Sequence, residues 1–132
     1  MRSLARECVF KYIFSRLFNQ NDEGLFDVLL EDKNLNSEDK IFARQLLVAI
    51  DAKTDFYLNE ISELSEGYKL NRIFNADKCA IIIGMAEYDN FSDTPVAVII
   101  DQAVNIAAKF STERSTDFVN GVLAEYVKKY SR

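Results

Sequence analysis

The sequence contains no histidine, no tryptophan, one proline, four glycines and two cysteines among its 132 residues. Histidine is the commonest general base and zinc ligand in proteins, so its absence removes most hydrolase and metalloenzyme constellations. The motifs GxxxxGK[ST], GxGxxG and GxSxG, which mark phosphate-binding loops and nucleophile elbows, are also missing. We therefore expect a binding protein without catalytic residues, bound metal or cofactor.

The two cysteines indicate neither a disulfide nor a metal site. Cys8 and Cys79 fall within apolar helical patterns and lack CxxC spacing, which predicts buried thiols. No apolar run approaches the roughly 18 residues of a membrane span, and Glu7 and Lys11 interrupt any signal-peptide core. We expect a cytoplasmic protein that does not contact the membrane.

The scarcity of proline and glycine, with little β-strand alternation, predicts an all-α fold. Short connections between successive helices favour antiparallel packing in a bundle. Thr94 is expected to cap a helix that has Pro95 in its first turn, and Gly67 to end the third helix. The expected helices, about seven, cover residues 3–18, 23–31, a long segment after residue 37 that ends at 67, 70–74, 76–89, 94–110 and 115–130.

Four segments carry a resemblance to a known family. They read AREC at residues 5–8, DTP at 93–95, DQAVNIAAKF at 101–110 and FVNGVL at 118–123. In this order and at these spacings they resemble the NusB family of bacterial transcription antitermination factors, over essentially the whole chain. The resemblance implies a NusB-like helical bundle that forms a single domain over residues 1–132. Two three-helix-type subdomains, residues 1–66 and 67–132, would pack together within it.

The resemblance also implies a function, which is transcription antitermination. The expected ligand is boxA-like single-stranded RNA of ribosomal RNA transcripts. It would be bound together with NusE, a ribosomal small-subunit protein, in the antitermination complex with RNA polymerase. The mechanism would be recruitment rather than catalysis.

Charge distribution bears on the RNA hypothesis. The chain carries a net charge of −5, but residues 1–16 hold four basic side chains against one acidic side chain. Arg2 and Arg6 are four residues apart and share a helix face, where two guanidinium groups could hold successive phosphates. The alternative is a solvated helix terminus. Ser3 and Leu4 stand where the family often has basic residues, which weakens the predicted RNA site.

A second predicted RNA contact lies at the start of the last helix. Phe118 falls at the edge of the apolar stripe, and the resemblance implies that it and Arg114 lie at the RNA surface. Asp117 replaces a lysine that is common in the family and so removes a positive charge. The alternative for Phe118 is an ordinary core position. Gly121, within the same helix, is expected to mark close helix packing.

The acidic part of the chain is expected to face a basic protein partner. Residues 20–66 carry 12 acidic and 4 basic side chains. Phe14 and Glu87 are the predicted NusE-facing residues; the alternatives are a core aromatic and an exposed carboxylate. Another function left open is an interaction module, or a homodimer, of the same fold with little RNA binding of its own. Ile82, Phe91 and Phe42 are apolar residues that could serve such a dimer.

Overall fold

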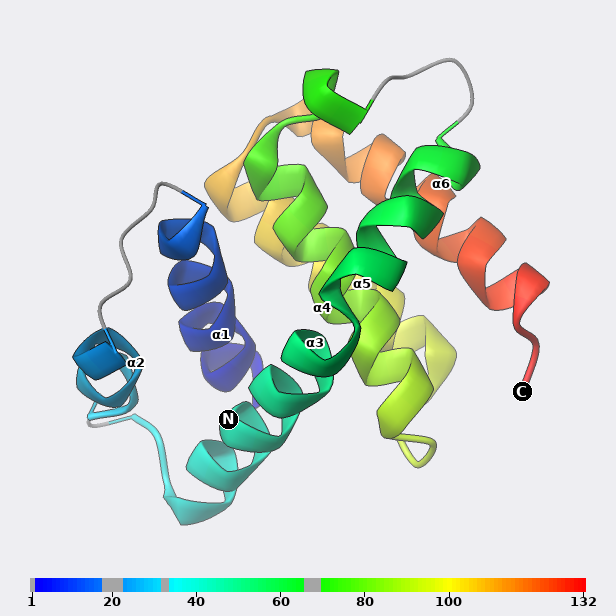
Figure 1. Cartoon of the computed structure of the whole chain (residues 1–132). Coiled ribbons are helices and arrows are strands. Elements are labelled where there is room, and N and C mark those ends of the chain that lie inside the picture. Colours follow the sequence, from blue (N-terminus) through cyan, green and yellow to red (C-terminus); the bar gives the residue numbers. More distant parts are fainter. Residues whose placement is uncertain (1, 18–22, 32–33, 66–69) are drawn as a thin grey trace.

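The computed structural model describes residues 2–17, 23–31, 34–65 and 70–132. In these ranges the chain forms six α-helices and one short 3₁₀ turn, without β-strands (Figure 1). The predicted seventh helix at residues 70–74 is only this turn, because it spans three residues before α4 begins. The elements are α1 (Arg2–Arg16), α2 (Glu23–Leu30), α3 (Ser37–Leu64), η1 (Leu70–Arg72), α4 (Asn75–Asn90), α5 (Val96–Phe110) and α6 (Glu113–Lys129).

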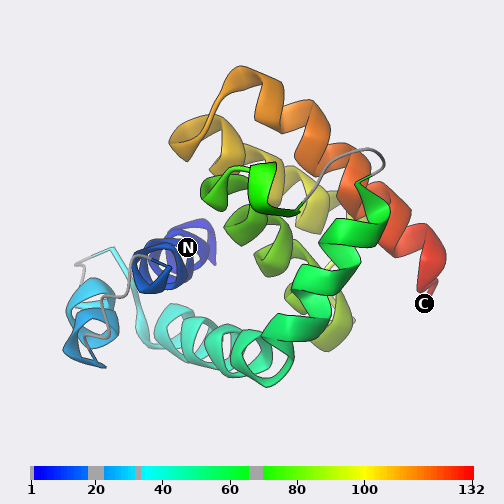
Figure 2. The ribbon, with the colours of Figure 1, turned by 45° about the horizontal axis from the view of Figure 1, so that its top comes forward.

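Helix α4 is the centre of the fold. All its residues from Cys79 to Tyr88 are buried, so it is covered on every side rather than on one stripe. It packs against α1, α3, α5 and α6, and Figures 1 and 2 show these helices around it. The predicted central position of this apolar helix is therefore confirmed.

Helix α3 bends in its middle, which the sequence did not indicate. Lys53 has φ −138° and ψ 24°, outside the helical region, and two helical segments meet there. The Thr54 hydroxyl donates a hydrogen bond of 2.8 Å to the Ile50 carbonyl oxygen just before the bend. As a result α3 curves along one side of the bundle, with its first half against α1 and its end beside α6 (Figure 2).

The helix starts differ in how they are capped. Asn36 and Asp39 form a capping box at α3, and Thr112 and Ser115 form one at α6. The predicted cap at α5 is wrong. Pro95, not Thr94, is the N-cap residue, and no side chain caps that helix. The Thr94 hydroxyl is buried and has no hydrogen-bond partner among the described residues.

Two glycines within helices have opposite surroundings. A Cβ built on Gly84 of α4 would lie 2.7 Å from Leu123 Cδ1, so this glycine lets α4 and α6 approach closely. A Cβ built on Gly121 of α6 would meet nothing within 4 Å. The prediction that Gly121 marks close packing is therefore wrong, because the space beside it is open.

The predicted buried thiols are confirmed: Cys8 and Cys79 are both buried, and neither is in a disulfide among the described residues. Burial raises the pKa of the Cys79 thiol to about 12. Within the described ranges, none of the helices is long and apolar enough to span a membrane. The Gly67 cap and the boundary between residues 66 and 67 lie outside the described residues, and the division into two subdomains stays a prediction.

Candidate nucleic-acid interface

The first turns of α1 place two guanidinium groups on one face, as the spacing predicts. Arg2 Cζ lies 4.5 Å and Arg6 Cζ 5.3 Å from the centre of the Phe42 ring on α3. Arg2 is exposed, whereas Arg6 is 4% exposed. The aromatic ring therefore holds Arg2 at the surface by a cation–π contact, with Arg6 beneath it.

Arg6 and Glu87 form a buried ion pair. Arg6 Nε donates to Glu87 Oε1 at 2.7 Å and Arg6 Nη2 donates to Oε2 at 2.6 Å. Their side chains are 5% and 1% exposed, respectively. The sequence placed Arg6 on an RNA surface and Glu87 on a protein surface; instead they face each other. Glu87 is buried because it belongs to α4, which is covered on every side.

A hollow of about 380 Å³ lies where the start of α1 meets the start of α5. Arg2, Ser3 and Arg6 line it from α1, and Thr94 lines it from the loop before α5. The α5 start has no side-chain cap, and helix starts carry a partial positive charge from unpaired amide groups. Because Glu87 neutralises Arg6, the remaining positive charge of this first hollow comes from Arg2, and the exposed carboxylate of Asp93 also lines the hollow.

A second hollow, of about 400 Å³, lies between η1, the start of α4 and the start of α6. Arg114 and Phe118 both line it, so the structure brings these two predicted residues together. It adds three residues that sequence reasoning missed: Arg72, Phe74 and Asp77. The sequence gives only a weak signal for these three residues. Arg72 and Phe74 stand two residues apart just before a helix, and Asp77 looks like an ordinary carboxylate in the first turn of a helix.

The second hollow combines groups that suit an unstacked base. Phe74 is 59% exposed, and two arginines stand beside it. Asp77 is 5% exposed; its Oδ2 accepts a hydrogen bond of 3.0 Å from Ser115 Oγ, while Oδ1 has no partner among the described residues. The hollow therefore offers a flat ring and positive charge to a ligand, whereas the unpaired Oδ1 of Asp77 is itself buried.

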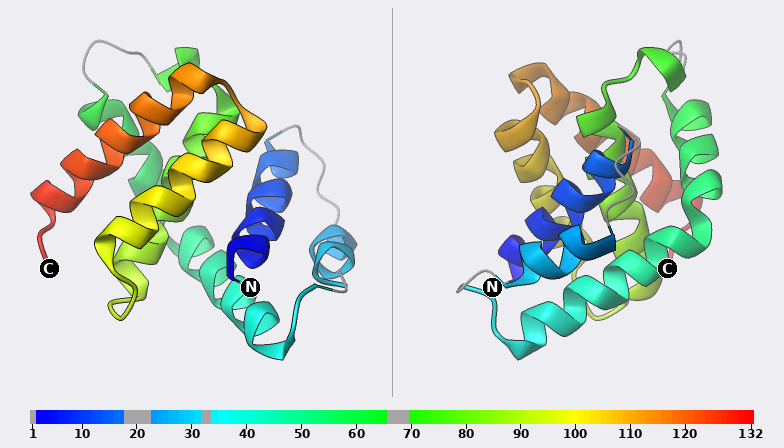
Figure 3. Two further views of the ribbon diagram at one scale, coloured as in Figure 1. Left: turned by 180° about the vertical axis from the view of Figure 1, so that it is seen from behind. Right: turned by 60° about the vertical axis from the view of Figure 1, so that its left-hand side comes forward.

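Helices α1 and α5 pack against each other between the two hollows. Lys109 pairs with Glu7 at 2.8 Å, and the amino groups of Lys109 and Lys11 lie 5.4 and 5.9 Å from the centre of the Phe110 ring. Figure 3 shows α1 beside α5, which ends next to the start of α6. Arg2 lines a hollow at the start of α5, and Arg114 lines one just after its end. A 15-residue helix, about 22 Å long, separates them.

Phe14, the second predicted partner-facing residue, is partly buried. Its ring stacks on Phe10 with 5.7 Å between ring centres, and it packs against the core. Phe10 in turn stacks on Phe110 at 4.9 Å. Phe42 and Ile82, considered for a dimer surface, are 2% and 6% exposed and belong to the core of this chain.

These features describe an all-helical protein, in the described ranges, with basic and aromatic side chains around two hollows. The chain belongs to the NusB family, whose family model matches residues 3–128. It is 32% identical to the transcription antitermination protein NusB of Methylacidiphilum infernorum, over 99% of this chain and 93% of the relative. It is 31% identical to that of Desulforudis audaxviator, over 97% and 91%. The NusB family consists of antitermination factors, not enzymes.

Solved structures show the same fold. T. maritima NusB superposes with a TM-score of 0.89 and 29% identity, covering 98% of this chain and 92% of that one. A crystal structure of the antitermination factors NusB and NusE in complex with double-stranded RNA gives a TM-score of 0.85 and covers 98% and 97%. Because the sequence identity to this second structure is 24%, the comparison shows a shared fold only. The prediction of an all-α, NusB-like fold is confirmed.

Proposed function

We propose that this cytoplasmic chain acts in antitermination by binding boxA-like single-stranded RNA of ribosomal RNA transcripts together with NusE. The observation that carries the proposal is the second hollow, where Arg72 and Arg114 flank exposed Phe74 and half-buried Phe118. Recognition of unstacked RNA needs flat side chains for bases and cations for phosphates.

The RNA strand would run along the α1–α5 seam. It would contact Arg2 at one end, pass Lys11 and Lys109, and place bases against Phe118 and Arg114 at the other end. Arg6 would contribute from beneath Arg2, where Glu87 fixes its guanidinium group. The net charge of −5 leaves few phosphate contacts for this chain alone, so a basic partner is needed for tight binding.

NusE is the proposed partner, because a related complex joins NusB, NusE and RNA. A basic protein would be attracted to the acidic residues of α2 and α3, which speeds association. Phe14 is the proposed contact on α1. Glu87 would act on this surface through Arg6 rather than by direct contact, since its side chain is 1% exposed.

Arg2→Ala and Arg114→Ala are each expected to reduce RNA affinity when NusE is present. Each change removes one phosphate contact, so the slope of log K against log salt should fall by about 0.7. The measurement is fluorescence anisotropy of labelled boxA-like RNA over a range of salt concentrations, with and without NusE. Lys128→Ala is the matched control, since it removes an exposed positive charge at the far end of α6.

Two results would contradict the proposal. One is the absence of RNA binding both with and without NusE. The other is an equal fall in affinity for Lys128→Ala and the two arginine variants, which would mean that only net charge matters. RNA too short to reach both hollows should respond to only one of the two arginine changes.

Phe74→Ala tests the stacking surface by itself. Loss of one stacked base is expected to cost about 1–3 kcal/mol of binding free energy. Because Phe74 is 59% exposed, the thermal midpoint should change little. The check is RNA affinity by anisotropy alongside thermal unfolding by circular dichroism; unchanged affinity would remove Phe74 from the proposed site.

A further inference from the structure

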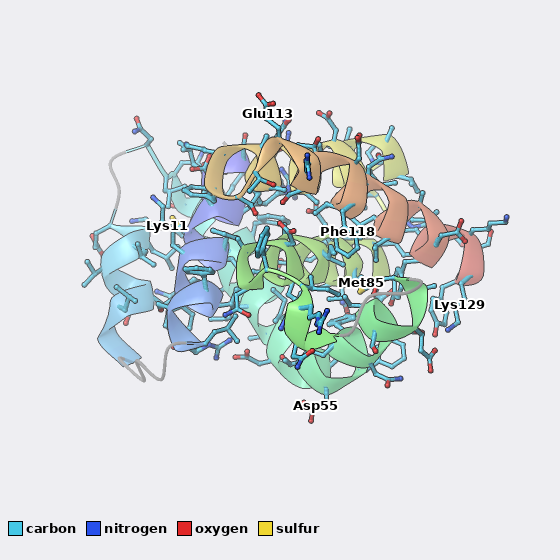
Figure 4. All side chains as sticks on the ribbon, turned by 90° about the horizontal axis from the view of Figure 1, so that it is seen from above. Lys11, Asp55, Met85, Glu113, Phe118 and Lys129 are labelled. Carbon is cyan, nitrogen blue, oxygen red and sulfur yellow. The ribbon has the colours of Figure 1, made fainter. Side chains whose placement is uncertain are left out.

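A third hollow lies on the other side of Phe118 from the basic one. It is a groove of about 420 Å³ between the end of α3 and the face of α6. Leu64, Phe118 and Val122 give it an apolar floor. Phe118, labelled in Figure 4, thus lines both hollows.

Gly121 makes room in the middle of this groove. It lines the groove and is exposed, and a Cβ built on it would meet nothing within 4 Å. Asp117, Gly121 and Glu125 follow one another at intervals of four residues, so they lie along one face of α6. A mid-helix glycine costs about 1 kcal/mol relative to alanine, and close packing does not explain this one.

The charge of the groove is negative. Asp117, Glu125 and Glu63 line it, and no lysine or arginine does so among the described residues. Asp117 and Glu125 form no ion pair within the described ranges. The Lys129 amino group lies 3.4 Å from the Glu63 carboxylate and 2.9 Å from that of Glu60, so Glu63 shares this cation with Glu60. RNA phosphates would be repelled here, whereas Arg72 and Arg114 attract them on the other side of Phe118. A cationic polypeptide matches both the charge and the apolar floor.

The spacing of the two outer carboxylates defines the ligand further. Asp117 and Glu125 are eight helical residues apart, about 12 Å along α6. In an extended peptide, residues four apart are separated by about 13 Å and point to the same side, as does the residue between them. We propose that this groove binds an extended segment of a protein partner. Every second residue of that segment would be, in order, basic, apolar and basic. The two basic side chains would meet Asp117 and Glu125, and the apolar one would lie over Gly121. This site goes beyond RNA binding and does not depend on it.

The test uses the full chain and a fluorescein-labelled peptide of sequence Gly-Lys-Ser-Leu-Ser-Lys-Gly, titrated by anisotropy at low salt. The control peptide, Gly-Ser-Lys-Lys-Ser-Leu-Gly, has the same composition and charge but the wrong spacing. We expect the spaced peptide to bind at least fivefold more tightly. RNA is absent, so this outcome is independent of the proposed antitermination activity.

Two variants of the protein locate the binding site. Gly121→Leu fills the groove at an exposed helical position and should weaken peptide binding at least tenfold while the fold remains at least as stable. The double change Asp117→Lys with Glu125→Lys should weaken binding by at least as much. The charge-matched control is Asp55→Lys with Asp101→Lys, two exposed carboxylates outside the groove; Figure 4 shows Asp55 well away from Phe118. We expect that control to change affinity less than twofold.

Three results would overturn the proposal. The first is no binding of the spaced peptide. The second is equal binding of the two peptides or equal loss in both charge variants, which would show attraction by net charge alone. The third is peptide binding that survives Gly121→Leu, because the groove would then not be the place of contact.

Discussion

Replacing Arg6 with alanine is expected to lower the free energy of unfolding by about 3–5 kcal/mol. The change would leave the Glu87 carboxylate, now 1% exposed, buried without its guanidinium partner. Chemical denaturation followed by circular dichroism gives the value, from the midpoint at constant slope. This is a large fraction of the stability of an ordinary domain, so much of the variant should be unfolded at modest denaturant concentrations.

A double variant separates the cost of an unpaired charge from the loss of contacts. Arg6→Met combined with Glu87→Leu replaces both ions with apolar side chains of similar size and should recover most of the lost stability, because neither charge must then be desolvated. If Arg6→Ala cost less than about 1 kcal/mol, the pair would be solvated in solution, contrary to the burial seen here.

The same substitution at two helical glycines is expected to have opposite effects. Gly84→Leu should cost about 3 kcal/mol, the upper end for overpacking, since even a Cβ there would lie 2.7 Å from Leu123, which is 1% exposed. Gly121→Leu should instead stabilise the chain by up to about 1 kcal/mol through helix propensity. Thermal unfolding of both variants against the unchanged chain is the measurement.

The comparison of the two glycines is internally controlled, because both variants have the same composition and both positions lie within α-helices. Equal destabilisation would mean that the space beside Gly121 is occupied in solution. A stable Gly84→Leu variant would mean that α4 and α6 can move apart without cost, contrary to the contact between them.

The helices could be predicted from the sequence because they depend on local signals. One proline, four glycines and apolar stripes set most of the helix limits to within a few residues. The bend at Lys53 could not be predicted in this way, since neither proline nor glycine marks it. The predicted Thr94 cap at α5 was wrong because Thr94 is buried beside the start of α1. That position depends on tertiary packing and not on local sequence.

The site was less predictable, because spacing along a helix indicates which side chains share a face but not what that face meets. Arg2 and Arg6 do share a face, yet only one of them is exposed. The resemblance to the NusB family implies that Glu87 faces a partner, whereas its side chain pairs with Arg6, 81 residues away. Phe74 and Asp77 join Phe118 only through the packing of α4 against α6.

The distance in sequence between Arg6 and Glu87 also affects the order of events during synthesis. Their 81-residue separation means that α1, although made first, cannot form this ion pair until α4 has left the ribosome. Until then the Arg6 guanidinium has no buried carboxylate to meet. The orientation of the first turn of α1, and with it the position of Arg2, is therefore settled late, when most of the chain already exists.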